Sequence, residues 1–362
     1  MPERVLPIGA KATRRRLVLT LRERPSARRR GVATALAITA GLTLSALVLV
    51  AMGVPPGELL QSTVIGTLLN PDDLHAVLEQ AGPLILVSVG ACCAFRAGFW
   101  NLGLEGQMIA GGIAATAVSL YGVGPEALRL PVMAAAAIAA AAGWVWIAVW
   151  LKQRFAVSEI ISTLLMNYIA FDLMQHLLFG AWKDPRDSFP HSAPLLDIER
   201  LPALGWGIGG GLVLAVLIAA VAGYAAQYSR LGLELRFVQA NPAMAHATGI
   251  RVGRVVLLAV LASAACAGLG GFVSISGIEG RLTGSFHVGL GFSSILIAFL
   301  ARNNPFGAIV ASLLVAMLFV ASQGLQVFYQ VPASIVQLIQ ALVVICIAAS
   351  EFAVRHRARF VA

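Results

Sequence analysis

Long apolar runs recur along this chain of 362 residues and constrain its fold more than any other feature. A run of roughly 20 apolar residues is long enough to cross the hydrocarbon layer of a bilayer as a helix. Hydrophobic residues make up 59% of the chain and charged residues 12%, with a mean hydropathy of +0.84, which lies outside the range of soluble domains. We count ten such runs, at 33–53, 79–96, 103–122, 130–151, 157–180, 205–227, 255–277, 289–301, 305–324 and 332–350. The sequence therefore predicts an all-α, polytopic helical membrane protein with about ten transmembrane helices.

The positive charges predict how these helices are oriented. If the N-terminus is cytoplasmic, 21 of the 26 Lys and Arg residues lie in cytoplasmic segments, ten of them before the first run. Because positive residues favour the cytoplasmic side of a membrane, this arrangement orients every loop consistently. It also requires an even number of spans and places both termini in the cytoplasm. The net charge of +9 thus indicates membrane orientation and not binding to nucleic acid.

Ten spans divide into two halves of five, which run in opposite directions as an inverted repeat. A Gly-rich segment follows the second span of each half: Phe99–Gly106 in the first and Phe286–Gly291 in the second. Irregular backbone at membrane depth is tolerated only where protein or a water-filled cavity satisfies its polar groups. Each segment therefore either lines a transport path or forms an ordinary tight connection between helices.

The sequence also predicts how the chain is divided. We expect residues 1–30 to form a basic cytoplasmic arm, residues 31–350 the transmembrane domain and residues 351–362 a cytoplasmic tail. The Arg-rich segment 1–30 is a disordered arm, a binder of anionic lipid or an orientation signal. The longest outward loops, 54–78 and 181–202, are either docking surfaces for a soluble partner or plain solvated loops.

The cytoplasmic segment 230–254 carries the signals of a short, capped helix. Asn241 is a favourable N-cap, Pro242 suits the first helical position, and Gly249 is expected to end the helix. A rigid element at the cytoplasmic face can transmit force from a partner. The residues that we expect to couple this chain to such a partner are Arg236, Asn241, Pro242, Ala243, Ala245, Thr248 and Gly249.

Polar residues in the spans and residues of the Gly-rich segments are candidates for contact with a transported solute. Amides both donate and accept hydrogen bonds, which suits sugar hydroxyls and base edges. The same side chains can instead tie helices together. The candidate path residues are Asn101, Glu105, Gln107, Asn167, Gln175, Phe286, Gln323 and Gln337.

The fifth span is predicted to present one polar seam along the helix. Its members are Ser158, Glu159, Ser162, Thr163, Asn167, Asp172, Gln175 and His176. Glu159 lies near Lys152 and Arg154 and is expected to form an ion pair at the cytoplasmic end. Asp172 and His176, one turn apart, either hydrogen-bond to each other inside the bundle or contact substrate.

The sequence contains no signature of an enzyme. Its three lysines, Lys11, Lys152 and Lys183, lie outside any phosphate-binding Gly-x-x-x-x-Gly-Lys-Ser/Thr motif, so we expect no ATP hydrolysis in this chain. We also expect no catalytic residue, metal site or cofactor. The four cysteines lie in apolar runs and are expected to pack in the core. Four small residues predict a close contact between helices: Ala267, Gly268, Gly270 and Gly271.

Three segments, Phe95–Met108, Val157–Tyr168 and Gly232–Gly249, together resemble a known family. It comprises the permease subunits of ABC importers of the simple-sugar and branched-chain amino acid type, and the match is to the branch associated with nucleoside uptake. The resemblance runs from about residue 80 to 350. Branched-chain and ribose-type relatives carry different Gly-rich sequences where this chain has Phe99–Gln107, which favours nucleosides. The long Arg-rich arm departs from the family pattern.

The resemblance implies a permease subunit of an ATP-driven importer in the bacterial cytoplasmic (inner) membrane, which forms the path for nucleosides. It implies three partners: an ATPase subunit that holds ATP and Mg, a second permease that is commonly a paralogue, and an extracytoplasmic binding lipoprotein or periplasmic protein. The alternative cargo is a simple sugar or a branched-chain amino acid. A different class, an ion-coupled secondary transporter, would depend on Glu159 or Asp172. The polar fifth span disfavours a membrane scaffold that transports nothing.

Overall fold

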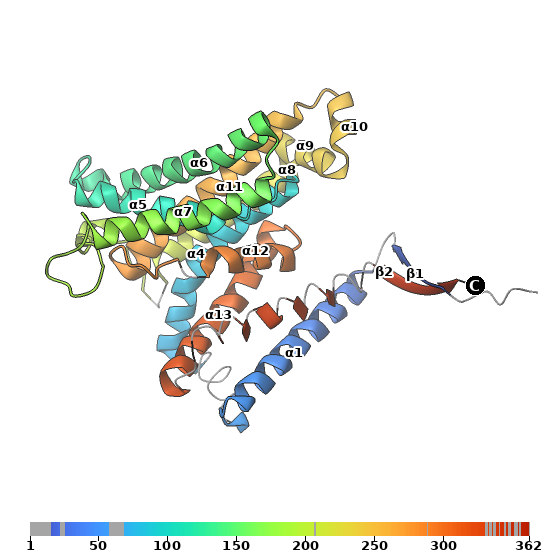
Figure 1. Ribbon diagram of the computed structural model, residues 1–362, viewed down its shortest axis with the longest axis horizontal. Coiled ribbons are helices and arrows are strands. Elements are labelled where there is room, and N and C mark those ends of the chain that lie inside the picture. The colour runs from blue at the N-terminus through green and yellow to red at the C-terminus, as the bar shows by residue number, and fades with distance from the viewer. Residues whose placement is uncertain are drawn as a thin grey trace, which may run out of the picture. The chain divides into compact units, whose positions relative to one another are not determined.

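The computed structural model describes residues 16–21, 26–57, 69–205, 208–287 and 289–329, with parts of 332–361. The chain divides into two compact units, Met1–Ala51 with Ala341–Ala362 and Met52–Gln340. Their elements are labelled in Figure 1. Most of the predicted basic arm lies outside the described residues.

The first unit contains both ends of the chain. Its helix α1 spans Ala27–Ala51 and so begins before the predicted boundary at residue 31. Strand β1 (Arg16–Leu21) pairs antiparallel with strand β2 (His356–Val361), with Arg16 opposite Val361. This small sheet departs from the all-α prediction. It was missed because hydrogen bonds between two segments far apart in the chain leave no recognisable local pattern in the sequence.

The second unit is a succession of helices. The longer ones are α4 (Pro71–Arg96), α5 (Leu104–Leu120), α6 (Arg129–Phe155), α7 (Glu159–Phe179), α8 (Gly210–Tyr228), α11 (Val252–Val273) and α13 (Pro305–Tyr329). The shorter ones are η2 (Glu126–Leu128), η3 (Asp197–Glu199), α9 (Arg230–Ala240), α10 (Pro242–Ala247), η4 (Ser274–Glu279) and α12 (Leu290–Leu300). Apart from an isolated bridge between Ala203 and Gly209, the described part of this unit holds no strand pairing, so the all-α prediction applies to it.

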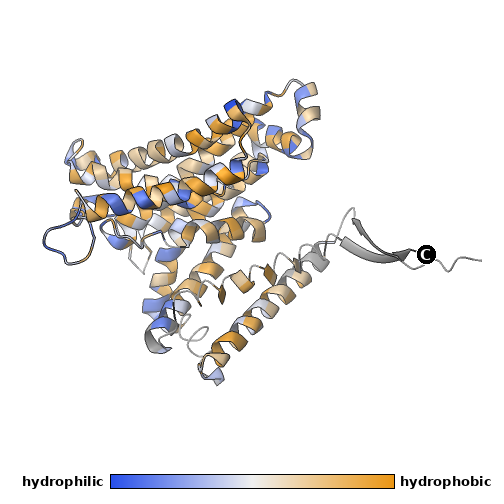
Figure 2. Ribbon diagram, viewed as in Figure 1, coloured by the Kyte–Doolittle hydropathy of each residue, from blue (hydrophilic) through white to orange (hydrophobic). Residues whose placement is uncertain are grey.

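The helices are those of a multi-pass membrane protein. Six described segments are long and apolar enough to cross a bilayer: Gly31–Ala51, Pro71–Arg96, Glu126–Phe155, Gly210–Tyr228, Val252–Glu279 and Pro305–Gly324. Helix α7 has 21 residues but carries more polar side chains, α5 has 17 residues, and α12 has 11. Figure 2 shows apolar residues along the helices, with hydrophilic residues gathered at their ends and connections.

Helix α4 lies at the centre of the second unit. In its most apolar stretch 72% of the residues are buried, against 22% in α8. It packs against α8, α11, α12 and α13. Glycines bring backbones into contact: a Cβ at Gly111 of α5 would lie 2.6 Å from the Cα of Gly268 of α11, and one at Gly271 would meet the carbonyl of Met108. The close contact predicted at Gly268 and Gly271 is therefore confirmed.

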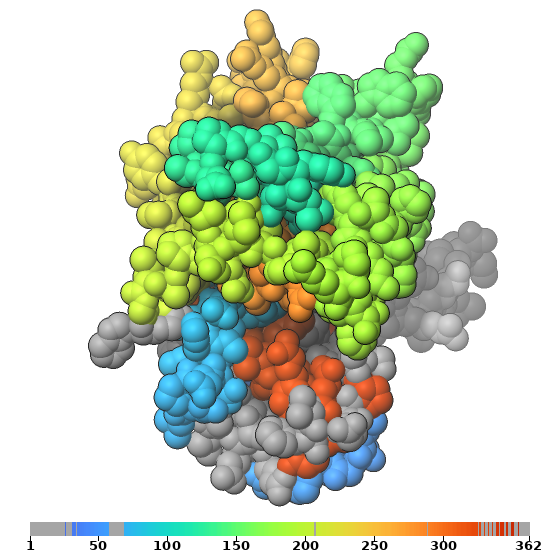
Figure 3. Space-filling model, turned by 90° about the vertical axis from the view of Figure 1, so that its left-hand side faces the viewer, coloured from blue at the N-terminus to red at the C-terminus, as the bar shows by residue number. Residues whose placement is uncertain are grey.

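The two ends of the second unit carry different structures. Helices α9 and α10 project at one end, and the connection from α7 to α8 lies at the other (Figure 1). In Figure 3 the yellow-green residues of this connection spread over the second end, next to the teal residues that join α5 to α6. A hydrogen bond of 3.1 Å from the indole of Trp182 to the hydroxyl of Tyr121 joins these two connections.

Candidate coupling element and transport path

The predicted capped helix is present as α10, and its ends are fixed as expected. The side-chain oxygen of Asn241 accepts hydrogen bonds from the backbone N–H groups of Ala243 (3.0 Å) and Met244 (3.2 Å). Pro242 occupies the first turn, where its missing N–H costs no hydrogen bond. Helix α10 stops at Ala247, and Gly249 follows with φ of +85°, a conformation that glycine adopts without strain. The cap and the stop are therefore confirmed.

One buried side chain attaches α10 to the helices behind it. Ala245 is 1% exposed and packs in a cluster with Leu235 and Val238 of α9 and Val255 of α11. The other predicted coupling residues lie at the surface: Arg236, Asn241, Pro242, Ala243, Thr248 and Gly249. The element thus presents a solvent-facing side to a partner and an apolar side to α9 and α11.

A basic pocket lies beside this element. It has a volume of about 170 Å³ and is lined by Arg96, Arg236 and Arg302, with no carboxylate among its lining residues. The Arg96 Nε donates to the carbonyl of Asn303 (2.6 Å), which joins the end of α4 to the turn between α12 and α13. Arg302 and Asn303 in that turn have φ of 55° and 58°, a region that non-glycine residues seldom adopt.

The first Gly-rich segment is held by an amide pair. Asn101 and Gln107 exchange two hydrogen bonds, of 3.0 and 2.8 Å. The Asn101 oxygen also accepts from the N–H of Gly103 (3.2 Å), and its nitrogen donates to Ser263 Oγ of α11 (3.1 Å). Both amides are buried, at 0% and 1% exposure. Every donor and acceptor of the Asn101 amide is therefore used within the protein.

Helix α7 holds the same segment from its other side. The Asn167 oxygen accepts from the N–H of Gly106 (2.8 Å), and its nitrogen donates to the carbonyl of Leu102 (2.9 Å). Thr163 Oγ1 accepts from the N–H of Leu102 (3.2 Å). In this conformation, Asn101, Gln107 and Asn167 form a tie between helices, one of the two roles open from the sequence, and their role in a path stays a prediction. We call these three residues the amide hub.

A buried acid in the first Gly-rich segment lies near an imidazole in the second. Glu105 Oε1 lies 3.9 Å from His287 Nε2. Glu105 Oε2 and His287 Nδ1 have no hydrogen-bond partner in the described part of the chain. The His287 ring lies against Phe286 and Phe171, with ring centroids 5.4 and 5.7 Å away. The sequence pattern singled out Glu105 and Phe286 but missed His287, although a histidine in a buried Gly-rich segment was itself a signal.

The remaining path candidates lie apart from this group. Gln175 is half-buried, with its Oε1 unpartnered among the described residues, and Gln323 is exposed on α13. Gln337 lies outside the described residues. Gln175 lies close to the residues just before the second Gly-rich segment, since a Cβ at Gly284 would lie 3.3 Å from its Oε1.

The single polar seam predicted for α7 is wrong. Thr163 and Asn167 are buried, whereas Asp172 and His176 are exposed. The nine residues from 163 to 172 make about two and a half turns at 3.6 residues per turn, so Asp172 lies on the opposite side of the helix. No hydrogen bond joins Asp172 to His176 in the described structure, which overturns the idea that they satisfy each other inside the bundle. The predicted ion pair at the cytoplasmic end is confirmed, because Lys152 Nζ lies 2.7 Å from Glu159 Oε1.

The long connection from α7 to α8 is an ordered structure at the opposite end. Its backbone is bonded to the segment that follows η4: the N–H of Ser192 donates to the carbonyl of Leu282 (3.1 Å), and that of Leu195 to Gly280 (2.8 Å). Glu199 is fully buried and pairs with Arg129 of α6 at 3.1 Å. No sequence signal linked these two residues, because 70 positions separate them.

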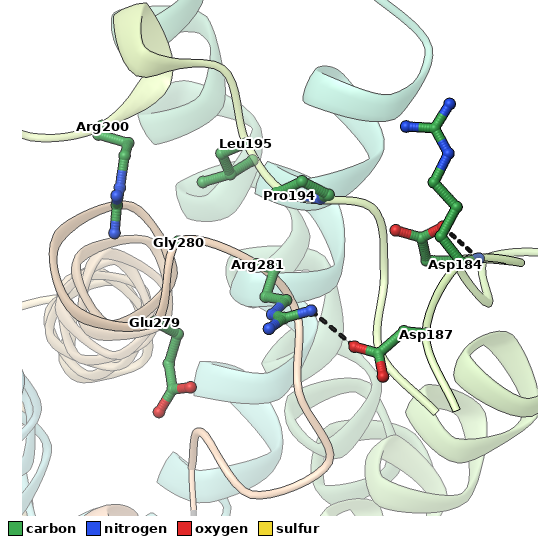
Figure 4. A pocket seen from close by; sticks show the side chains of 9 residues that line it. Asp184, Asp187, Pro194, Leu195, Arg200, Glu279, Gly280 and Arg281 are labelled. Carbon is green, nitrogen blue, oxygen red and sulfur yellow. Dashed lines mark hydrogen bonds and ion pairs between the residues drawn. The ribbon is translucent and has the colours of Figure 1, made fainter. Parts of the chain in front are cut away.

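A charged cleft opens between this connection and η4 (Figure 4). It has a volume of about 370 Å³. Its lining includes Asp184, Asp187, Arg200, Glu279 and Arg281. Arg281 and Asp187 point toward each other across it at 2.8 Å. A hydrogen bond from the N–H of Phe189, with smaller contributions from His191 and Arg281, lowers the pKa of Asp187. The cleft thus holds fixed charges of both signs.

A multi-pass helical unit carries a capped element at one end and a charged cleft at the other, and so belongs to the class of multi-pass membrane proteins. The chain belongs to the family of branched-chain amino acid transport system permease components, whose model matches residues 74–348. This confirms the resemblance to permease subunits of ABC importers.

Three curated relatives illustrate this membership. A glucose ABC transporter permease protein of Haloferax volcanii is 36% identical over 334 residues, which cover 89% of this chain and 88% of that protein. A guanosine ABC transporter permease protein of Bacillus subtilis is 30% identical and covers 77% and 81%. A nucleoside ABC transporter permease protein of Lactococcus lactis is 26% identical and covers 86% and 89%.

Proposed function

We propose that this permease subunit forms the translocation path of an ATP-driven importer of nucleosides in a bacterial cytoplasmic membrane. The observation that carries the ATP-driven part is α10, a helix fixed at both ends and exposed on the side away from the bundle. The likeness to guanosine and nucleoside permeases supports the cargo. About ten spans in two inverted halves, with both termini in the cytoplasm, are the topology proposed for this role.

Force applied to α10 has a direct route to the opposite end of the unit. Ala245 packs in one hydrophobic cluster with Val255, near the start of α11. Helix α11 continues into η4 without a break, and the Ser276 carbonyl in η4 accepts a hydrogen bond from the N–H of Leu201 in the outer connection (2.9 Å). At 1.5 Å per residue, this path of 28 residues, Val252–Glu279, is about 40 Å long. A shift of α10 is thereby passed to the charged cleft.

We propose three protein partners for this arrangement. An ATPase subunit, which supplies ATP and Mg, docks on α9 and α10. An extracytoplasmic binding protein docks at the charged cleft, where Arg200 and Arg281 offer positive charge. A second permease subunit completes the path. The chain itself carries no cofactor, and its apolar spans contact membrane lipid.

A sugar is the second candidate cargo. The glucose permease relative has the highest identity of the three, at 36%, and supports this reading. Both cargoes present hydroxyl groups, whereas only a nucleoside presents an aromatic base. Discrimination between them therefore rests on whether the path accepts a flat heterocycle.

The test is purification of this chain from its native membrane in mild detergent, followed by mass spectrometry and an ATPase assay. We expect a co-purifying ATPase with phosphate-binding loops and a binding protein whose nucleoside-loaded form stimulates ATP turnover. Stimulation by a glucose-loaded form alone would establish the sugar alternative. Isolation of the chain alone, with solute movement driven by a proton or sodium gradient, would overturn the proposal in favour of a secondary transporter.

A further inference from the structure

One side of α7 carries polar residues whose side chains are exposed in the described structure. Tyr168, Asp172 and His176 follow at intervals of four residues, so they lie within about 80° of one another along the helix. Tyr168 is 63% exposed, and Asp172 and His176 are also exposed. No hydrogen bond or ion pair involves the side chain of Asp172 or His176 in the part of the chain that the structure describes. We call these three residues the α7 stripe.

This position makes lipid an unfavourable surrounding for Asp172 and His176. Asp172 lies seven residues before the end of α7 at Phe179, which is about 10 Å along the helix axis. Ionisable side chains at membrane depth face a bundle interior or a water-filled cavity, because hydrocarbon does not solvate them. The exposed side of α8 differs, since Leu217, Val221 and Tyr224 suit contact with lipid.

The carboxylates of Glu105 in α5 and Glu159 in α7 each lie near a basic or imidazole side chain. Glu105 is buried beside His287, and Glu159 pairs with Lys152. Asp172 is exposed and forms no ion pair in the described structure. It is therefore available to a ligand.

The same side of α7 changes character along its length. In the half nearer α9 and α10 it presents Ile161 and Leu165, which are 57% and 55% exposed. In the half nearer the charged cleft it presents Asp172 and His176, with the aromatic Phe179 at its end. An apolar surface packs dry against a second subunit, whereas a polar one requires water or a polar ligand. A cavity that opens toward the cleft end fits this change.

We propose that the α7 stripe binds a cargo made of an aromatic heterocycle and a hydroxylated sugar, in a water-filled path closed by a second permease subunit. Tyr168 supplies a ring on which a base stacks. Asp172 accepts hydrogen bonds from N–H or O–H groups, and His176 donates or accepts one. This inference rests on the proposed function and adds the residues that recognise the cargo.

Cysteine labelling tests the environment of the stripe without requiring transport. Asp172→Cys and His176→Cys, in the assembled complex with the native cysteines replaced, are treated with a membrane-impermeant maleimide. The matched control is Leu217→Cys on the lipid-facing side of α8. We expect labelling at least tenfold faster at positions 172 and 176 than at 217, and slower labelling when a nucleoside-loaded binding protein is present. Rates equal to that of Leu217→Cys would overturn the water-filled path.

Transport kinetics in proteoliposomes test recognition. Tyr168→Ala is expected to reduce nucleoside uptake roughly 5- to 100-fold, because the stacking surface is lost, and Tyr168→Phe to retain most of it. Asp172→Asn is expected to reduce uptake roughly tenfold or more, through loss of a charge-assisted hydrogen bond. ATP turnover without binding protein should stay within about twofold, as should uptake by Leu217→Ala.

The outcomes separate the two proposals. If the unaltered complex imports no nucleoside, the proposed cargo fails, and the same variants are compared with glucose as substrate. Equal uptake losses for Tyr168→Ala and Tyr168→Phe with glucose would rule out a stacking role. If the unaltered complex imports nucleosides and the stripe variants match Leu217→Ala, the proposed function stands and the binding role of the stripe is overturned.

Discussion

The two sides of α7 carry polar residues of similar kinds in opposite circumstances. On the buried side, Asn167 and Thr163 hydrogen-bond to the backbone of the first Gly-rich segment. On the exposed side, Asp172 and His176 have no described partner. Satisfied polar groups hold an irregular backbone together, whereas unsatisfied ones are free to bind solute. Polarity in a membrane helix therefore indicates function only when its partners are known.

The strongest test of this contrast is Asn101→Leu in the amide hub. The change leaves the Gln107 amide and the N–H of Gly103 without partners in a buried site, so we expect a loss of about 3 kcal/mol in the free energy of unfolding. Thermal or denaturant unfolding in detergent measures it. Asp172→Asn is the matched control and is expected to change stability by less than about 0.5 kcal/mol. Equal losses in both variants would remove the distinction between the two sides.

A second test concerns backbone contact behind the hub. Gly111→Ala places a Cβ 2.6 Å from the Cα of Gly268, so α5 and α11 must move apart. Overpacking of this kind costs about 1–3 kcal/mol. Gly143→Ala is the control, because no atom lies within 4 Å of its added Cβ, and helix propensity favours alanine by about 1 kcal/mol. Destabilisation by Gly143→Ala as large as that by Gly111→Ala would contradict the close contact.

The sequence predicted features that depend on neighbouring residues. The cap at Asn241, the stop at Gly249 and the ion pair of Glu159 with Lys152 each involve positions a few residues apart, so local rules determined them. The small residues of α11 likewise indicated a close contact without naming its partner. The six described apolar segments followed from hydrophobicity alone.

Features that depend on residues far apart in the chain could not be predicted from the sequence. The pair of Arg129 and Glu199, and the sheet formed by the two ends of the chain, join segments with no shared local pattern. The two sides of α7 were also misassigned, because spacings of three to five residues drift around a helix and, over nine residues, reach its opposite side. Burial decides which side a residue occupies, and burial depends on packing of the whole unit.

A smaller loss of stability is expected at α10, the coupling element, which packs near the start of α11. Replacing Asn241 by Ala removes the cap of α10 and is expected to cost about 1 kcal/mol of local helix stability. Together with Gly249→Ala, which strains a residue at φ of +85°, it should impair ATP-coupled uptake while membrane insertion stays normal. Uptake assays with insertion controls measure both. Unchanged uptake in the double variant would count heavily against α10 as the lever.

The smallest effect is expected at the charged cleft, where Asp187 has partners that the α7 stripe lacks. The N–H of Phe189, His191 and Arg281 stabilise the ionised carboxylate, so its pKa is lowered in the folded protein. Its stabilising contribution is then complete above the ordinary aspartate pKa of about 3.9 and is lost only as pH falls through the lowered folded value. Arg281→Gln should raise the pKa of Asp187 without restoring the ordinary value, because the N–H of Phe189 remains. Carboxyl carbon NMR of labelled protein measures this shift, with Arg186→Gln as the control. Titration of Asp187 at the ordinary pKa in the unaltered protein would show that its partners do not stabilise the carboxylate. The contrast between Asp187, which has partners, and Asp172, which has none in the described structure, would then lose its basis.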